Sequence, residues 1–221
     1  MPLNMVIPVG SGSTAGTGIT TYSGLVTSAG EWLNRSDLVL KVPLFIQMVE
    51  ERLSRILRCP EMEEEATIVT DAERIDLPTD FRQARALYLD TDPRQELEAV
   101  TLGTLRTKYA QQITGKPECY AISGGEIVLG PAPDDEYNAI LTYYQDIPAL
   151  STDLETNWVI SKHPSLYLYG TLLQAEFFGW NDERLPLIKA AWDEAIGELM
   201  GQGRAKQFGA APLRLRPSVR E

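Results

Sequence analysis

The sequence predicts an α+β protein in which a helical bundle of about four main helices is interrupted by an antiparallel β insertion. Apolar side chains recur at helical spacing in residues 21–60 and 150–203, the helical bundle core. Residues 61–149, the β-rich insertion, instead hold short runs of β-branched and aromatic residues. The two ends differ from both. Residues 1–20, small and polar, predict a flexible N-terminal arm, and residues 204–221 an extended basic C-terminal tail.

The first two helices are predicted from their start signals and apolar faces. Thr21 is a suitable N-cap, and apolar side chains follow it at i, i+3, i+4 and i+7. Residues 34–37 break this pattern. Pro43 suits the first turn of a second helix, where its missing N–H costs no hydrogen bond. We expect that helix to end at Cys59 and Pro60. Its predicted buried stripe consists of Phe45, Ile46, Val49, Leu53, Ile56 and Leu57.

The insertion is predicted to be an antiparallel β unit that packs on the helices. Its partly alternating runs are EEATIVT, ERIDLP, ARALYLD, ELEAV, ECYAIS, EIVLGP and AILTYYQDI. Residues 123–125, Ser-Gly-Gly, predict a hairpin turn between two of these runs, because glycine tolerates the positive φ that such turns require. Residues 101–112 predict a single short helix within the unit.

Helical spacing returns after the insertion. A third helix is predicted to start at Pro164 and to reach about Phe178. Asn181 or Asp182 is expected to cap a fourth helix, which residues 201–203, Gly-Gln-Gly, are expected to end. The third helix is apolar on nearly every side, a pattern typical of a helix covered on two faces. In so short a chain we expect the second cover to be another subunit, and we expect Gly170 to allow the close approach of a neighbouring backbone.

His163 is the only histidine and immediately precedes Pro164. Nucleophilic catalysis needs a base beside a serine, cysteine or threonine, and a catalytic zinc site usually draws two or three imidazoles. We therefore interpret His163 as a structural residue at a helix start. The glycine-rich GSGSTAGTG lacks the Lys-Ser/Thr ending of a phosphate-binding loop. No catalytic residue, cofactor or metal ligand is predicted.

Carboxylates are the remaining candidates for chemistry. Residues 63–65 and 134–136 are acidic runs that could supply a glycosidase-type pair, but contiguous runs beside turn residues are typical of solvated surface. Glu176 lies in the strongly apolar third helix. We interpret it as facing solvent or pairing with a cation of a neighbouring subunit. The alternative is a buried carboxylate with a raised pKa.

Charge is laid out unevenly along the chain. The whole chain carries −11, which divides into −15 for residues 1–200 and +4 for residues 201–221. An acidic body disfavours nucleic-acid binding, and a short basic tail suits an acidic partner. Apolar stretches are too short to anchor the chain in a membrane. Cys59 and Cys119 are expected to be buried free thiols rather than a disulfide.

Long segments of the chain, in order, resemble the head-to-tail adaptor (connector) proteins of tailed bacteriophages. The resemblance covers about residues 20–200. The segments that carry it are TYSGLVTSAGEWLNRSDL, VPLFIQMVEERLSRILRCPEME, LPTDFRQARALYLD, GKPECYAISGGEIVLGPAPD and LTYYQDIPALSTDLETNWVISKHPSLYLYGTLLQAEFFGWNDERL. It implies a non-enzymatic virion protein at the head–tail junction, made in the host cytoplasm. It also implies a ring, commonly of twelve copies, between the portal protein and the tail tube or nozzle protein. Genomic DNA would pass through the lumen without specific binding.

The same resemblance implies roles for particular residues. The C-terminal segment would dock on the portal through Arg204, Lys206, Arg214, Arg216 and Arg220. The aromatic block of the third helix would form subunit contacts through Tyr167, Tyr169, Phe177, Phe178 and Trp180. Two alternatives are an envelope-degrading hydrolase carried in the phage tail and a tail-completion protein that does not touch the portal.

Overall fold

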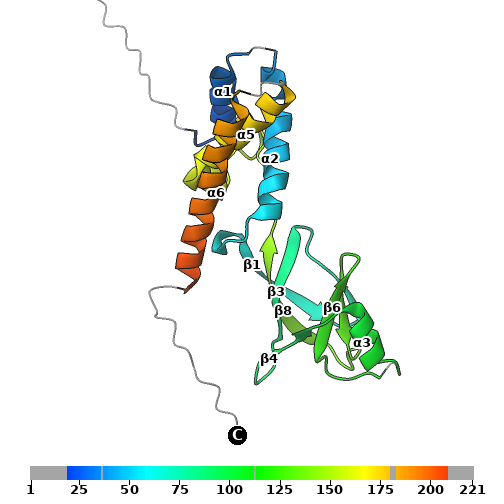
Figure 1. Ribbon diagram of the computed structural model, residues 1–221. Coiled ribbons are helices and arrows are strands. Elements are labelled where there is room, and N and C mark those ends of the chain that lie inside the picture. The colour runs from blue at the N-terminus through cyan, green and yellow to red at the C-terminus, as the bar shows by residue number, and fades with distance from the viewer. Residues whose placement is uncertain (1–18, 36, 112, 180–182, 209–221) are drawn as a thin grey trace, which may run out of the picture. The chain divides into compact units, whose positions relative to one another are not determined.

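The structure is a computed structural model that describes residues 19–35, 37–111, 113–179 and 183–208 (Figure 1). These residues form six α-helices and two four-stranded sheets, which confirms the predicted α+β class. They divide into two compact units, the first drawn from residues 1–51 and 149–195 and the second from residues 52–148 and 196–221. None of the described helices is long and apolar enough to cross a membrane.

The four longer helices of the prediction are all present. They are α1 (Tyr22–Leu33), α2 (Val42–Ile56), α5 (Pro164–Phe178) and α6 (Leu185–Phe208), with the short α4 (Trp158–Lys162) before α5. Their arrangement as one bundle stays a prediction, because the boundary between the two units falls within α2 and α6. The predicted start of α1 is confirmed: the Thr21 hydroxyl accepts a hydrogen bond from the Gly24 N–H at 3.1 Å.

Helix α5 is enclosed by its own chain over most of its length. Leu166, Tyr167 and Leu172 are buried, and α1 lies alongside. A Cβ on Gly170 would lie 2.8 Å from Val49 of α2 and 3.0 Å from Nε1 of Trp192 on α6. The close approach that Gly170 permits is therefore made by side chains of the same chain. The expectation of a second subunit along the whole helix is wrong, and only the C-terminal end of α5 leaves aromatic side chains exposed.

The second unit contains both sheets. One has the strand order β1 (Glu63–Thr70), β8 (Tyr137–Gln145), β3 (Phe81–Leu89), β4 (Gln95–Glu96), and the other β2 (Arg74–Asp76), β7 (Glu126–Gly130), β6 (Cys119–Ser123), β5 (Glu98–Ala99). Within these two sheets the strand pairings are antiparallel, except that of β5 with β6, which is parallel. The insertion is thus not wholly antiparallel. The predicted run ELEAV divides into β4 and β5, which belong to different sheets.

Strand β7 shows why its sequence is continuously apolar. Successive side chains of a strand point to opposite faces. Ile127 and Leu129 enter the core shared with β3 and β8, whereas Val128 packs in a smaller cluster with Leu105 of α3 (Leu102–Lys108). Both faces of this strand are therefore covered, one by the other sheet and one by the predicted short helix.

The predicted hairpin between β6 and β7 is confirmed. Ser123 and Glu126 are paired, so Gly124 and Gly125 form a two-residue turn with φ of 67° and 88°. Such positive φ values at both positions are those of the turn type that matches strand twist. Both cysteines are free and buried, as predicted.

The predicted end of the fourth helix is wrong. Helix α6 continues through Gly201 and Gly203 to Phe208. In the second unit, Gly203 packs against Cys59, with an ideal Cβ only 3.4 Å from that side chain, and Lys206 forms an ion pair with Glu61. These contacts offset the low helix propensity of glycine, about 1 kcal/mol per residue. The proposed caps at 181 and 182 lie outside the described residues.

Candidate interaction surface

His163 lies at the junction of α4 and α5. The backbone N–H of His163 donates to the Val159 carbonyl at 2.7 Å, at the C-terminal end of α4. The backbone carbonyl of His163 accepts from the Leu166 N–H at 3.1 Å. Pro164 follows as the first residue of α5. His163 therefore lies at a helix start, as predicted, and its backbone groups form hydrogen bonds with both α4 and α5.

The acidic runs bond locally instead of facing each other across a cleft. Glu63 pairs with Arg85. The Tyr137 hydroxyl donates to Asp134 at 2.7 Å, and the Glu136 N–H donates to the Asp135 carboxylate at 2.8 Å. Among the residues that the structure describes, no group of three or more His, Cys, Asp or Glu side chains is placed to hold a metal.

Glu176 is buried, and its partner comes from the same chain. The Arg184 guanidinium lies 3.0 Å from Oε1 of Glu176. Arg184 immediately precedes α6, so this pair ties the end of α5 to the start of α6. The expectation that Glu176 faces solvent or meets a neighbouring subunit's cation is therefore wrong.

A buried polar network, which the sequence reading missed, connects α2, α4 and α5. Oε1 of Glu50 accepts hydrogen bonds from the Leu150 N–H at 2.7 Å and the Tyr167 hydroxyl at 3.0 Å. The Asn157 amide donates to the same hydroxyl at 2.7 Å, and its carbonyl oxygen caps α4 by accepting from the Ile160 N–H at 3.0 Å. Burial raises the pKa of the Glu50 carboxyl, against the opposing effect of its two hydrogen bonds.

The aromatic residues predicted at subunit contacts differ in their exposure. Tyr167 is fully buried in this network, and Tyr169 is half-buried. Phe177 and Phe178, at the end of α5, are 72% and 55% exposed. Trp180 lies outside the described residues. The structure thus leaves Phe177 and Phe178 as the most accessible described members of the block.

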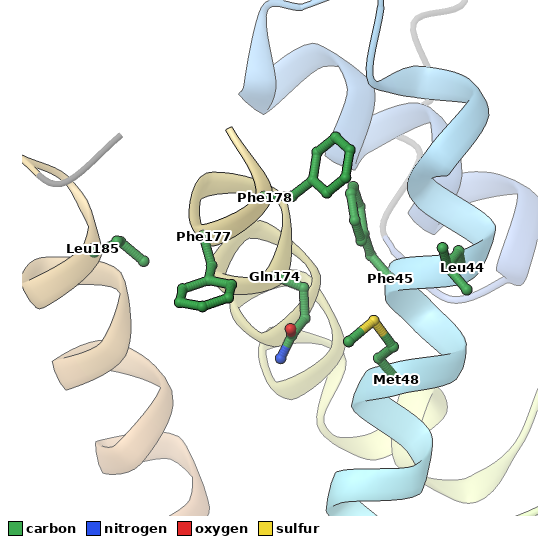
Figure 2. Close-up of a pocket in the computed structure, with 7 residues that line it drawn as sticks. All are labelled: Leu44, Phe45, Met48, Gln174, Phe177, Phe178 and Leu185. Carbon is green, nitrogen blue, oxygen red and sulfur yellow. The ribbon is translucent and has the colours of Figure 1, made fainter. Parts of the chain in front are cut away.

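These two phenylalanines line an apolar groove of about 520 Å³, here called the α2–α5 groove (Figure 2). The described residues that line it are Leu44, Phe45, Met48, Gln174, Phe177, Phe178 and Leu185. Phe45 and Met48 point toward Phe178 and Gln174, and Phe177 points toward Leu185 of α6. The buried Phe45 ring lies 5.7 Å from the Phe178 ring, centroid to centroid. None of these seven described residues carries a charge.

The groove arises because α2 is apolar on two sides. Phe45 and Val49 point into the core, whereas Leu44 and Met48, four residues apart on a neighbouring face, remain 51% and 45% exposed. In the sequence, these two apolar sides correspond to the near-continuous apolar run VPLFIQMV. We predicted only the buried stripe, because an exposed apolar face cannot be distinguished from a covered one by spacing alone.

Of the basic residues predicted to dock on a partner, two lie within the described part of the chain. Lys206 is engaged with Glu61 on the same chain. Arg204 lies in the last turns of α6. Arg214, Arg216 and Arg220 lie outside the described residues.

A comparison with protein families finds one match that covers most of the chain. The family model described as "SU10 adaptor protein" matches residues 20–216. The matched region includes all the described helices and strands and begins one residue before the Thr21 cap. No curated protein matches the chain.

Proposed function

The chain belongs to the SU10 adaptor protein family, a family of bacteriophage adaptors, and from this premise we propose that its copies form a ring that joins the portal to the tail. In this proposal it is a structural protein of the virion, assembled in the host cytoplasm, and not an enzyme. Its partners are further copies of itself, commonly twelve, the portal protein above and the tail tube or nozzle protein below.

The exposed α2–α5 groove is the observation that carries the proposal. Contiguous exposed apolar side chains on a soluble protein are typical of protein–protein interaction sites. Phe177 and Phe178 supply aromatic side chains of the kind enriched at such sites, with Tyr169 on the same helix. Tyr167 drops out of the proposed contact because its own chain covers it fully. Trp180 stays in the proposal on sequence grounds.

Portal docking is assigned to the C-terminal tail, and more narrowly to residues 209–221. Lys206 already has a partner in Glu61, which supports a role in holding the end of α6 on its own chain. Arg214, Arg216 and Arg220 lie beyond that point and provide the positive charge for an acidic partner surface. Arg204 stays in the proposal as a member of the last turns of α6.

The acidic body supports the proposed passage of DNA. Residues 1–200 carry a net charge of −15, and tight DNA binding requires cationic side chains that displace counterions from phosphates. A lumen with this charge would let the genome pass without holding it. The hydrolase alternative rested on the carboxylate-rich β unit and on Glu176, and it loses the second support because Glu176 is paired with Arg184.

The subunit contact is tested by replacing Phe177 with aspartate. Phe177 is 72% exposed, so we expect the free energy of unfolding of the isolated chain to change by less than about 0.5 kcal/mol. Burial of a new carboxylate in the contact should weaken association by about 30-fold or more. Sedimentation velocity over a concentration series measures ring formation by the wild type and its loss in Phe177→Asp.

A matched control is Leu187→Asp on α6. Leu187 is 75% exposed but does not line the groove. This variant should assemble as the wild type does. Wild-type assembly by Phe177→Asp, or equal loss in both variants, would contradict a contact at the groove.

A further inference from the structure

We propose that residues 2–9 of one copy occupy the α2–α5 groove of the neighbouring copy. The inference rests on the proposed ring and names the part of the partner subunit that meets this site. It assigns a role to an N-terminal segment that lies outside the family match, which begins at residue 20.

The chemistry of the groove selects this segment. Among the described lining residues, none has a carboxylate or a cationic side chain, and Gln174 is the one polar member. Residues 1–18 likewise contain no charged side chain, and residues 2–9 read PLNMVIPV, with Val6 and Ile7 at the centre of an apolar run. The C-terminal residues 209–221 place an arginine beside each of their leucines, so they would bring unpaired charge into an apolar site.

The segment is long enough to reach a neighbour. The chain is fixed where α1 begins, because the Tyr22 N–H donates to the Glu155 carbonyl at 2.7 Å and the Ser23 N–H to the Glu155 carboxylate at 3.0 Å. Residues 10–21 then separate the apolar run from this point. Twelve residues span at most about 43 Å when extended, more than twice the ~18 Å length of α1.

A segment-to-groove contact also has the geometry that a ring needs. The two surfaces are different parts of the chain, so the contact is head-to-tail, and head-to-tail contacts generate rings when the rotation closes. Each copy has one segment and one groove, so every groove in a closed ring is filled. The folded contacts of the ring hold the segment near its groove and raise its effective concentration.

Met48 reports occupancy without any label, because its exposed thioether is open to oxidation by hydrogen peroxide. We compare the full-length wild type with the full-length variant V6D/I7D and quantify Met48 sulfoxide by mass spectrometry. In the assembled wild type, oxidation of Met48 should be at least about fivefold slower than in the dilute monomer. In assembled V6D/I7D it should stay near the monomer rate. Met62, which is fully buried, controls for unfolding.

A second measurement does not depend on assembly. A synthetic peptide of residues 2–9 is added to dilute full-length V6D/I7D, with the same peptide carrying the two aspartates as control. The native peptide should slow oxidation of Met48 at least about threefold, and the control peptide should have no effect. Equal effects of both peptides, or none from either, would overturn the assignment.

These measurements distinguish a failure of the segment-to-groove contact from a failure of ring assembly. Assembled V6D/I7D that protects Met48 as well as the wild type does would show that a folded face of a second copy covers the groove. Protection in the dilute wild-type monomer, lost in V6D/I7D, would place the segment in its own groove. Either result overturns the proposal and leaves the ring intact. A wild type that never assembles, with or without portal, overturns the ring, whereas the peptide measurement still decides whether the groove binds the segment.

Discussion

Replacement of Glu50 with alanine should lower the free energy of unfolding by about 2–4 kcal/mol. The substitution leaves two buried donors, the Leu150 N–H and the Tyr167 hydroxyl, without the oxygen that accepts from both. A buried donor that loses its partner costs about 1–3 kcal/mol. The substitution also removes the desolvation cost of a buried carboxylate, which offsets part of this loss. Urea unfolding followed by tryptophan fluorescence measures the difference.

Glu50→Gln is the matched control, because its amide oxygen can accept both hydrogen bonds. We expect it to change the free energy of unfolding at pH 5 by less than about 1 kcal/mol. The two proteins should then diverge with pH. Burial raises the folded-state pKa of Glu50 above its ordinary 4.5, so the folded state binds more protons there, and the wild type loses stability relative to the variant as pH rises from 4.5 through the raised value. An equal loss in Glu50→Gln and Glu50→Ala, or a pH-independent difference between wild type and Glu50→Gln, would contradict the assigned network.

Removal of residues 209–221 should weaken portal binding at least a hundredfold. The deletion removes three arginines from each copy, and a multivalent joint loses every such contact at once, so the effect exceeds that of one contact by about two orders of magnitude or more. All described elements remain, so the free energy of unfolding should be unchanged. Co-sedimentation with purified portal measures the loss.

Lys206→Ala distinguishes docking from anchoring at the end of α6. The variant loses the ion pair with Glu61, which is partly exposed, so we expect a cost below about 1 kcal/mol and portal binding close to that of the wild type. Undiminished portal binding after removal of 209–221 would contradict the assignment to the tail. A large loss in Lys206→Ala would move the docking site to α6.

Elements with local signals could be predicted from the sequence. The Thr21 cap and Pro164 set the starts of α1 and α5 because capping and proline effects act within one turn. Gly124 and Gly125 fixed the β6–β7 turn for the same reason. These signals depend on neighbours in sequence, so a single chain is enough to read them.

Features made by distant contacts could not be predicted. Gly203 is a poor helix former, yet α6 passes through it because Cys59, far away in sequence, packs there. The parallel pairing of β5 with β6 likewise depends on how the chain returns to the sheet. Local propensity is a weak signal when tertiary packing opposes it.

The sequence predicted only part of the candidate site. The exposed phenylalanines of α5 were predicted as contact residues, but Tyr167 was placed with them because spacing does not reveal that Glu50 and Asn157 enclose its hydroxyl. Met48 was missed because it lies outside the buried stripe of α2. The proposed function rests on long ordered segments that resemble a family, and the family match over residues 20–216 confirms that resemblance.

The central claim is that copies of this chain join into a ring on the portal. Native mass spectrometry of the purified protein, alone and mixed with purified portal, tests it most directly. We expect one closed species whose mass is a fixed multiple of the mass of the chain, commonly twelve, and which is bound to the portal when portal is present. A protein that stays a monomer in both samples, or that assembles but never binds the portal, would contradict the claim.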